Sequence, residues 1–227
     1  MTKAGRPRAG ETGGDRAEAL KRSALDLMAR EGFGNVTIKK IGREAGVTTA
    51  VIYYYFRDKE ELLLAAIEYA IDEAFAYFES LQGDVEDPAQ LLHEWLRMHV
   101  ILSGTIFKMI KMVLDYKLSP AHSDDIEAAL QRFYERERTV LTRCLEAGRE
   151  AGLFAPVPAG EIAVLISTFL DGAMIRSGLL DDFALERTVA LFERLLWDRL
   201  GLPEARRPSG GLAAGRAAAV AGPPQKK

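Results

Sequence analysis

A short run of residues between Thr48 and Tyr55 carries side chains that can bond to a phosphate backbone. If this run is a helix, each residue turns by about 100°, so that one side collects Thr49, Ala50, Tyr53 and Tyr54. Hydroxyl groups donate hydrogen bonds to phosphate oxygens, and small or aromatic side chains contact thymine methyl groups in the major groove. Three consecutive tyrosines cannot all belong to a core, so Tyr53 and Tyr54 are expected to point outward. For Tyr55 and Phe56 we favour a structural aromatic cluster.

The sequence around this run predicts two short helices joined by a tight turn. Thr37 is a suitable N-cap for a first helix that ends at Gly46, and Thr48 is a suitable N-cap for the second. Asp58 and Glu61 then form a capping-box pattern that begins a third helix. Two short helices joined by a glycine-containing turn form a helix-turn-helix unit, whose second helix enters the DNA major groove. DNA contact is therefore the predicted chemistry of the outward side.

Two further segments precede this unit. Asp15 predicts the start of a helix that ends at Gly32, and its apolar stripe would pack beneath the helix-turn-helix. Residues 1–14 carry Arg6 and Arg8 on either side of Pro7. They form either a disordered terminus or an arm for a narrow A·T-rich minor groove, whose negative potential attracts arginine. Both interpretations stay open.

Residues 15–65 resemble the DNA-binding domain of the TetR family of bacterial regulators. The matching residues are Thr37, Ile41, Ala45-Gly46-Val47, Thr48, Ile52-Tyr53-Tyr54-Tyr55-Phe56 and Lys59-Glu60-Glu61-Leu62. The resemblance implies that the positions of Thr37, Tyr53 and Lys59 contact phosphates. Lys39 reaches a phosphate or a guanine edge, or is an ordinary solvated lysine. The complete predicted set of DNA-contacting residues is Arg6, Arg8, Thr37, Lys39, Thr48, Thr49, Ala50, Tyr53, Tyr54 and Lys59.

The charge is distributed unevenly along the chain. Residues 1–60 carry +4, residues 61–202 carry −11 and residues 203–227 carry +4, for a net charge of −3. Basic ends around an acidic body suit a small nucleic-acid-binding head on a body that repels DNA. The single cysteine, Cys144, excludes an internal disulfide and fits a reducing compartment. We see no signal-peptide pattern and no apolar run of about 18 residues, so a cytoplasmic protein without membrane contact is expected.

Helical spacing of apolar residues continues to residue 202 and predicts an all-α fold. Glycine and proline signals divide this part into helices at about 58–81, 87–102 and 105–116, from Ser119-Pro120 to about 148, and at 161–179 and 184–200. The expected domains are a flexible basic arm (1–14), a helix-turn-helix DNA-binding domain (15–60) and a helical ligand-binding and dimerisation domain (61–202). Residues 203–227, rich in Ala, Gly and Pro, are predicted to be a disordered tail.

Methionine and aromatic side chains are concentrated in the middle of the body. Such side chains line adaptable apolar cavities, although at helical spacing they are more often ordinary core. The resemblance implies an inducer site among these helices. The candidate lining residues are Trp95, Met98, His99, Phe107, Met109, Met112, Tyr116, Phe133, Tyr134, Phe169 and Met174. The expected ligand is a small hydrophobic or aromatic molecule, with long acyl chains as one option.

Residues 161–179 are apolar on nearly every side. A helix of this kind must be buried on more than one side. One chain can cover one side, and the other side is expected to meet a second copy; a purely intramolecular core is the alternative. The resemblance implies a homodimer held by the last two main helices. The candidate interface residues are Leu170, Met174, Ser177, Val189, Phe192 and Leu196.

No pattern in the sequence supports catalysis, a metal or a cofactor. His93 and His99 are not spaced to share one helical face, as two ligands of one metal ion would need. Acidic pairs such as Asp124-Asp125 lie at helix starts, where the helix dipole stabilises carboxylates. No cluster of titratable groups is evident in the body. We therefore interpret the chain as a DNA-binding transcriptional regulator, most often a repressor in such families, that binds a near-palindromic operator. The alternatives are a non-enzymatic interaction protein without a small-molecule ligand, and a transcriptional activator.

Overall fold

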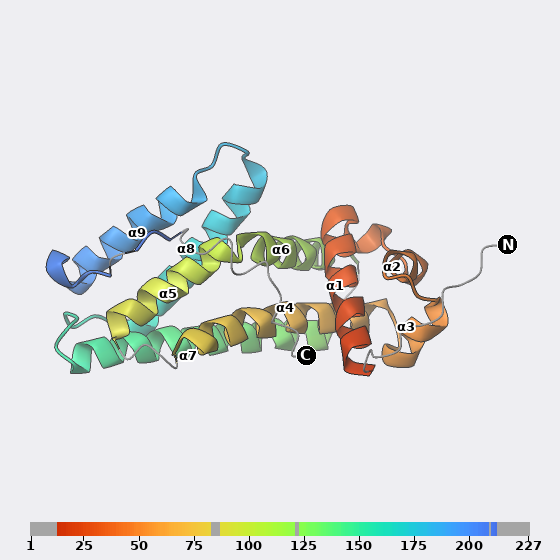
Figure 1. Ribbon diagram of the computed structural model, residues 1–227, viewed down its shortest axis with the longest axis horizontal. Coiled ribbons are helices and arrows are strands. Elements are labelled where there is room, and N and C mark those ends of the chain that lie inside the picture. Colours follow the sequence, from red (N-terminus) through yellow and green to blue (C-terminus); the bar gives the residue numbers. More distant parts are fainter. Residues whose placement is uncertain (1–12, 83–86, 121–122, 209, 213–227) are drawn as a thin grey trace, which may run out of the picture. The chain divides into compact units, whose positions relative to one another are not determined.

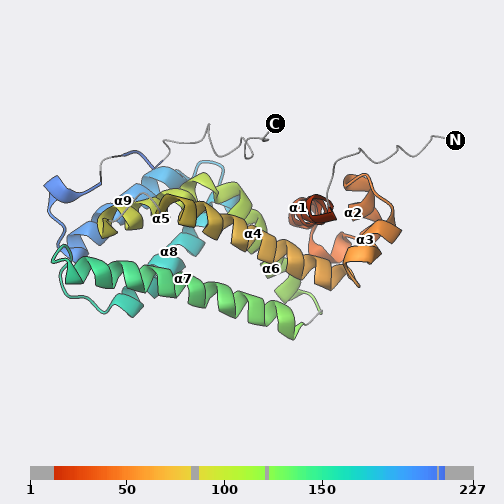
Figure 2. The same cartoon turned by 60° about the horizontal axis from the view of Figure 1, so that its bottom comes forward.

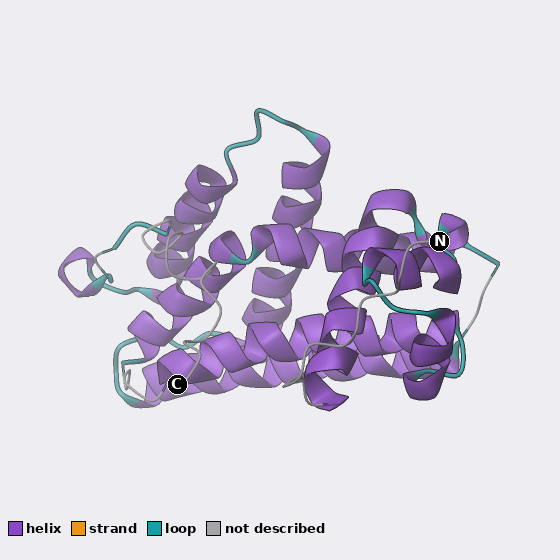
Figure 3. Ribbon diagram, turned by 45° about the vertical axis from the view of Figure 1, so that its right-hand side comes forward, coloured by secondary structure: helices purple, strands orange, loops and turns teal. Residues whose placement is uncertain are grey.

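The computed structural model describes residues 13–82, 87–120, 123–208 and 210–212. These residues form helices and no strand, which confirms the predicted all-α class (Figure 3). In chain order the helices are α1 (Gly13–Glu31), α2 (Ile38–Glu44), α3 (Thr49–Tyr55), α4 (Lys59–Gln82), α5 (Pro88–Ile101), α6 (Ser103–Leu118), α7 (Asp124–Glu150), α8 (Ala159–Leu179) and α9 (Leu185–Leu200), with short 3₁₀ helices η1 (Phe33–Asn35) and η2 (Glu204–Arg206). The predicted arm with Arg6 and Arg8 lies outside the described residues.

The chain folds as two compact units. The first unit comprises the described residues up to Tyr69 together with those of Met112–Ser123, and the second comprises Ala70–Lys111 and the described residues from Asp124 onward. α4 and α6 therefore each supply residues to both units. The C-terminal part of α6 belongs to the same unit as the helix-turn-helix, although it lies far away in sequence.

Local sequence signals account for the ends of the short helices. The Thr37 hydroxyl accepts a hydrogen bond from the backbone N–H of Lys40 at 3.3 Å, which begins α2. The Asp58 carboxylate accepts one from the N–H of Glu61 at 2.8 Å, as the capping-box pattern predicts. Between α2 and α3 the chain turns at Gly46, whose φ of 68° favours glycine.

The predicted helix start at Ser119-Pro120 is wrong. The Ser119 hydroxyl donates to the carbonyl of Tyr116 at 2.7 Å, so this serine closes the end of α6. α7 begins later, and Asp124 and Asp125 lie in its first turn. Carboxylates in the first turn of a helix are stabilised by the positive end of the helix dipole. This interaction, and not the Ser119-Pro120 pattern, sets the start of α7.

In the first unit, α2 packs against both α1 and α3 (Figure 1). Its buried core includes Leu20 and Met28 from α1, Ile41 from α2 and Ile52 from α3. A Cβ atom at Gly42 would lie only 2.9 Å from the carbonyl oxygen of the residue that follows the turn. The glycine therefore lets α2 approach this turn closely, which sets where α3 begins.

In the second unit, α7 lies against α5 and α8, and α9 lies against the same two helices (Figure 2). α8 has two different sides, because Ile162 and Ile166 are buried while Val164 and Leu165 are exposed. Contrary to the sequence-based expectation, α8 is long and apolar enough to span a membrane by length and composition. A core helix of a soluble protein passes the same test, and a third of the apolar stretch is buried in the chain.

The first part of the segment predicted to be a disordered tail has a described structure. Arg207 donates to the Asp198 carboxylate at 2.5 Å and to the carbonyl of Leu202 at 3.2 Å, which ties η2 to the end of α9. Leu212 is buried. A buried leucine and one ion pair therefore connect residues that composition alone assigns to a tail with the rest of the chain.

Candidate nucleic-acid interface and ligand site

The outward side of α3 is exposed as its helical spacing predicts. Tyr53 and Tyr54 are 56% and 82% exposed, and Thr49 and Ala50 are exposed beside them, whereas Ile52 is fully buried. The core therefore fixes α3 through its inward side and leaves two phenol groups in solvent. Phenol hydroxyls in this position can donate to phosphate oxygens without disturbing the core.

Two threonines at helix starts differ in how their hydroxyls are used. Thr37 accepts the N–H of Lys40, so its oxygen is occupied as a cap. Thr48 occupies the N-cap position of α3, but its exposed side chain makes no capping hydrogen bond. The Thr48 hydroxyl is therefore available to an external partner. Lys39, at the start of α2, is also exposed.

Lys59, which the sequence assigns to phosphate contact, bonds within its own unit. Its ammonium group donates to the carbonyls of Phe33 at 2.8 Å and Val36 at 3.1 Å, and it lies 4.0 Å from the centre of the Phe33 ring. Partial burial lowers the pKa of this lysine. Lys59 thus ties the start of α4 to the connection between α1 and α2, and at most one of its three N–H donors is left for DNA.

The C-terminal part of α6 contacts the same connection. The backbone N–H of Phe33 donates to the Asp115 carboxylate, and the rings of Phe33 and Tyr116 meet edge to face at 5.1 Å. Two residues predicted to line a ligand site, Met112 and Tyr116, are therefore buried in the first unit. The other predicted lining residues belong to the second unit.

The predicted lining residues of the second unit fall into two groups. Trp95, Met98, His99, Met109 and Met174 are buried, while Phe107, Phe133, Tyr134 and Phe169 are half-buried or exposed. Trp95 lies 5.3 Å from His99, ring centre to ring centre, and Phe133 lies 5.0 Å from Tyr134. Tyr134 is joined to a polar cluster that the sequence analysis did not include.

This polar cluster lies where α7 meets α5 and α8. Ser167 of α8 donates its hydroxyl to one oxygen of Glu137, and His99 Nε2 of α5 lies 3.8 Å from the other. One turn before Glu137, Tyr134 donates to the Asp171 carboxylate at 3.0 Å. Glu137 is only 3% exposed. The body of the chain therefore brings titratable groups of three helices together, with Glu137 and His99 buried and Asp171 half-buried, contrary to the sequence-based expectation.

Burial controls the protonation of these groups. It raises the pKa of Glu137 to about 7 and lowers that of His99 to about 4. Burial also raises the pKa of Asp171 and, together with the nearby Asp171 charge, that of Tyr134. At pH 7 the imidazole is neutral, so its contact with Glu137 is not an ion pair.

The buried acid interrupts a helical stripe that a closer inspection of α7 could have identified. Glu137 lies four residues after Phe133 and four before Leu141, so it occupies a core position of this helix. Ser167 and Asp171 stand four apart on α8 in the same way. Counting only apolar residues along each helix conceals such positions, because the polar residue is read as a gap.

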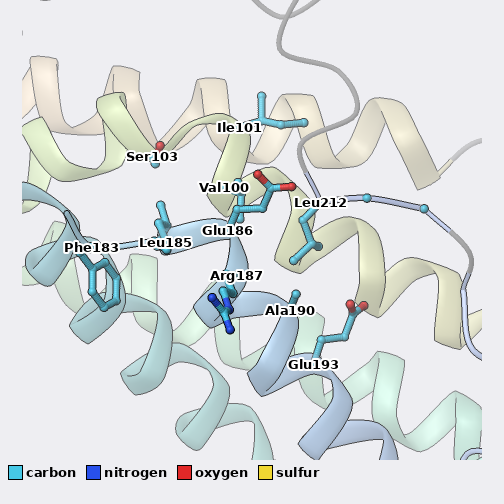
Figure 4. A pocket seen from close by; sticks show the side chains of 13 residues that line it. Val100, Ile101, Ser103, Phe183, Leu185, Glu186, Arg187, Ala190, Glu193 and Leu212 are labelled. Carbon is cyan, nitrogen blue, oxygen red and sulfur yellow. The ribbon is translucent and has the colours of Figure 1, made fainter. Parts of the chain in front are cut away.

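A separate cavity of about 540 Å³ lies beside the start of α9 (Figure 4). Apolar side chains including Leu212 line it together with three charged residues, Glu186, Arg187 and Glu193. Glu193 is paired with the buried His93 at 2.6 Å. None of the predicted ligand-lining residues borders this cavity. The described residues contain no group of three or more His, Cys, Asp or Glu side chains placed to hold a metal ion.

The predicted dimer-interface residues mostly face the interior of the chain. Leu170, Met174, Val189 and Leu196 are buried, the Ser177 hydroxyl donates to the carbonyl of Met174 at 2.8 Å, and Phe192 stacks on Phe169 at 3.9 Å. The same two helices and their connection expose another set of large apolar side chains: Val164, Leu165, Leu179, Leu180, Leu191 and Leu195. The accessible apolar surface of α8 and α9 is therefore made by these residues.

Two family models match the chain. Residues 22–66 match the model described as bacterial regulatory proteins of the tetR family, and residues 111–201 match the C-terminal model of BetI-type transcriptional repressors. The transcriptional regulator BetI of Rhizobium meliloti is 27% identical over 186 residues, which is 78% of this chain and 86% of that protein.

Solved structures share the fold at low sequence identity. A transcriptional regulator from Saccharomonospora viridis in complex with choline has a TM-score of 0.71 at 20% identity, covering 82% of this chain and 96% of that one. The fatty acid degradation regulator FadR from Bacillus halodurans has a TM-score of 0.70 at 20% identity, covering 87% of this chain and all of that one. The helix-turn-helix, the helical body and the two family models lead to one assignment: the chain belongs to the TetR family of bacterial transcriptional regulators.

Proposed function

We propose that the protein is a ligand-responsive transcriptional repressor that binds a near-palindromic operator as a homodimer. The observation that carries this proposal is the outward side of α3, where Tyr53 and Tyr54 stand in solvent beside Thr49 and Ala50. Because Ile52 anchors α3 in the core and the opposite side of the helix is exposed to solvent, that side can enter the major groove. In this proposal Thr37, Lys39, Thr48 and the tyrosines hold phosphates, while Thr49 and Ala50 meet base edges.

The proposed dimer uses the exposed apolar side of α8 and α9. Six large aliphatic side chains stand in solvent on α8, α9 and the connection between them, and exposed apolar side chains of this size mark protein contacts. A two-fold axis through this patch would pair identical surfaces, and the resulting dimer would carry two copies of α3 for the two halves of a near-palindromic operator. The same contact would explain why α8 is apolar beyond the needs of its own chain.

The proposed release step is a population shift. A small molecule held among α5, α7 and α8 favours the DNA-incompetent conformation, and it must bind that conformation more tightly for the equilibrium to move. α4 and α6 supply residues to both units, so they are the elements that can carry the change. In the first unit, Asp115 and Tyr116 of α6 contact Phe33 directly.

The test is a mobility-shift assay with the DNA upstream of the gene, repeated over a range of salt concentrations. If the protein is a regulator, it should bind this DNA specifically, and its affinity should fall as the salt concentration rises. A single shifted band with the stoichiometry of a dimer should account for the binding. Absence of binding to any duplex would favour the interaction-protein alternative. Expression of a reporter behind the same DNA then separates a repressor from an activator, because the bound protein lowers the signal in one case and raises it in the other.

A further inference from the structure

The connection between α1 and α2, residues 32–36, accepts hydrogen bonds from or donates them to side chains of three helices, α2, α4 and α6. We propose that Asp115 of α6 is a positioning residue that couples the helical body to the DNA-contacting start of α2. Since DNA binding by α2 and α3 is itself proposed above, this role of Asp115 rests on that function.

The α1–α2 connection determines where α2 begins. Its last residue, Val36, is buried, and the next residue, Thr37, caps α2 and is a proposed phosphate contact. Lys40 of α2 donates its ammonium group back to the carbonyl of Asn35 at 3.0 Å. Because no residue separates the connection from the cap, a shift of the connection also shifts Thr37.

Asp115 contacts the backbone of this connection directly. The N–H of Phe33 donates to the Asp115 carboxylate, and the ring of Tyr116 meets the buried Phe33 ring edge to face. A hydrogen bond to a carboxylate is roughly twice as strong as one between neutral groups. Gly32 has a φ of 86°, and a Cβ atom there would lie 3.2 Å from the Asp115 carboxylate. The glycine therefore provides both the backbone conformation and the space that this contact needs.

The place of Asp115 on α6 distinguishes it from Lys59, which holds the same connection from α4. Both helices supply residues to both units. On α6 the second unit ends at Lys111, and Asp115 lies four residues, about one helical turn, after it. On α4 the second unit begins at Ala70, and Lys59 lies 11 residues, about three turns, before it. A displacement of α6 therefore reaches the connection over the shorter stretch of helix.

The bond between Asp115 and Phe33 gives the coupling a physical form. While the bond is made, the start of α2 is fixed before DNA arrives. When α6 shifts and the carboxylate leaves Phe33, the connection loses this support, and DNA binding must order it at a cost in affinity. Coupling between two sites is reciprocal, so DNA that fixes the connection also restrains the part of α6 that belongs to the second unit.

Hydrogen–deuterium exchange of the full chain, with and without a saturating amount of the upstream duplex, tests this role. The reporter is residues 103–111, the part of α6 in the second unit. We expect DNA to slow exchange there by about 5-fold or more in the unmodified protein and to have no effect there in Asp115→Ala. Asp115→Asn should keep the protection, since its amide oxygen can accept the same N–H. Equal protection in the unmodified protein and Asp115→Ala, or protection in neither, would overturn the inference.

Lys59→Ala is the matched control for a contact that only stabilises the connection. It removes two hydrogen bonds to the same connection, but from α4. Bound DNA should still protect residues 103–111 in this variant, because Asp115 remains in place. If Lys59→Ala and Asp115→Ala lose the protection equally, Asp115 has no special part in the coupling and the inference fails.

Gly32→Ala tests the same contact with Asp115 unchanged, and it replaces Asp115→Ala if that variant does not fold. The added Cβ atom crowds the carboxylate, so DNA should no longer protect residues 103–111. Gly152→Ala is the control for backbone strain, because Gly152 has a φ of 69° and a Cβ atom there would meet no described atom within 4 Å. Protection should persist in Gly152→Ala. Full protection in Gly32→Ala would contradict the proposed contact.

DNA affinity separates this inference from the regulator proposal. Asp115→Ala should weaken DNA binding about 5- to 50-fold, a common range for coupling between two sites. Asp125→Ala removes the same charge at an exposed position of the second unit and should change the affinity by less than about 2-fold. DNA binding without Asp115-dependent protection removes only the role of Asp115. Absence of binding to any duplex removes the regulator proposal and this role together.

Discussion

The outward side of α3 exposes its polar groups to solvent, whereas the polar cluster between α5, α7 and α8 removes its polar groups from solvent. Tyr53 and Tyr54 keep their hydroxyls in water, where an incoming phosphate can displace solvent with little effect on the fold. Glu137 is buried and Asp171 is half-buried, and burial raises the pKa of both carboxyl groups by penalising their charged forms. Substitutions on the first surface should therefore change binding and leave stability alone, whereas substitutions in the second should change stability as well as binding.

The largest expected effect comes from two adjacent leucines of α9. Leu195 is 59% exposed and Leu196 is 5% exposed. Leu196→Glu places a charge in the core and should lower the free energy of unfolding by about 3–5 kcal/mol, enough to lose most of the folded signal. Leu195→Glu should keep the helical circular dichroism spectrum but weaken self-association by at least about 2 kcal/mol, measured by sedimentation equilibrium.

These two variants control for each other, since the chemical change is the same and only the side of α9 differs. A Leu195→Glu protein that still sediments as a dimer would remove this patch from the proposed interface. A Leu196→Glu protein that remains folded would mean that the inner side of α9 tolerates charge, and the contrast between outward and inward positions would fail.

The second effect is the pH dependence of stability caused by Glu137. Its pKa is raised from 4.5 to about 7, so between these values the unfolded chain has lost the proton while the folded chain keeps it. The free energy of unfolding therefore falls as pH rises through this window, by on the order of 3 kcal/mol at completion. Glu137→Gln should be more stable than the unmodified protein at pH 8 by this amount, and about equally stable at pH 4.

Chemical denaturation at both pH values measures this difference. His99 has the opposite slope, because burial lowers its pKa from 6.5 to about 4 and acid then favours the unfolded chain. Both proteins contain His99, so its contribution cancels in the comparison. A variant with no advantage at pH 8 would show that Glu137 already has a compensating partner in solution.

The head of the protein could be predicted from sequence because its determinants are local. Thr37, Gly46 and Asp58 each set a helix end within a few residues, and the outward position of Tyr53 follows from one helical turn. The bonds of Lys59 could not be predicted, since its partners Phe33 and Val36 are carbonyl groups more than twenty residues away. Side-chain type alone cannot distinguish a lysine that binds backbone from one that is free.

The body was predictable as helices but not as a site. Glu137, Ser167 and His99 come from three helices, and only their packing shows that they meet. The sequence also could not predict which side of α8 is exposed, because both sides are apolar. Leu170, for example, is buried, whereas Leu165 is exposed. A hydrophobic pattern predicts that a helix is covered on several sides, but not which side its own chain covers.

The third prediction compares two lysines of the first unit, Lys59 and Lys39. Lys59→Ala removes two hydrogen bonds to carbonyls and should lower the free energy of unfolding by about 1–2 kcal/mol. Lys39→Ala should leave stability within about 0.5 kcal/mol, since Lys39 is exposed. If Lys39 contacts a phosphate, its loss lowers the slope of log affinity against log salt by about 0.9. A salt slope that changes with Lys59 and not with Lys39 would reverse the two assignments.

The smallest effect is the loss of one hydroxyl from α3. Tyr53→Phe should weaken operator and non-specific DNA by the same amount, about 1 kcal/mol, because a phosphate contact carries no sequence information. Tyr55→Phe is the matched control, since Tyr55 is half-buried and its ring packs against Phe56 at 6.3 Å. Neither variant should shift the melting temperature by more than a few degrees. Fluorescence anisotropy on operator and scrambled duplexes measures both, and a Tyr53→Phe effect confined to the operator would place its hydroxyl on a base edge.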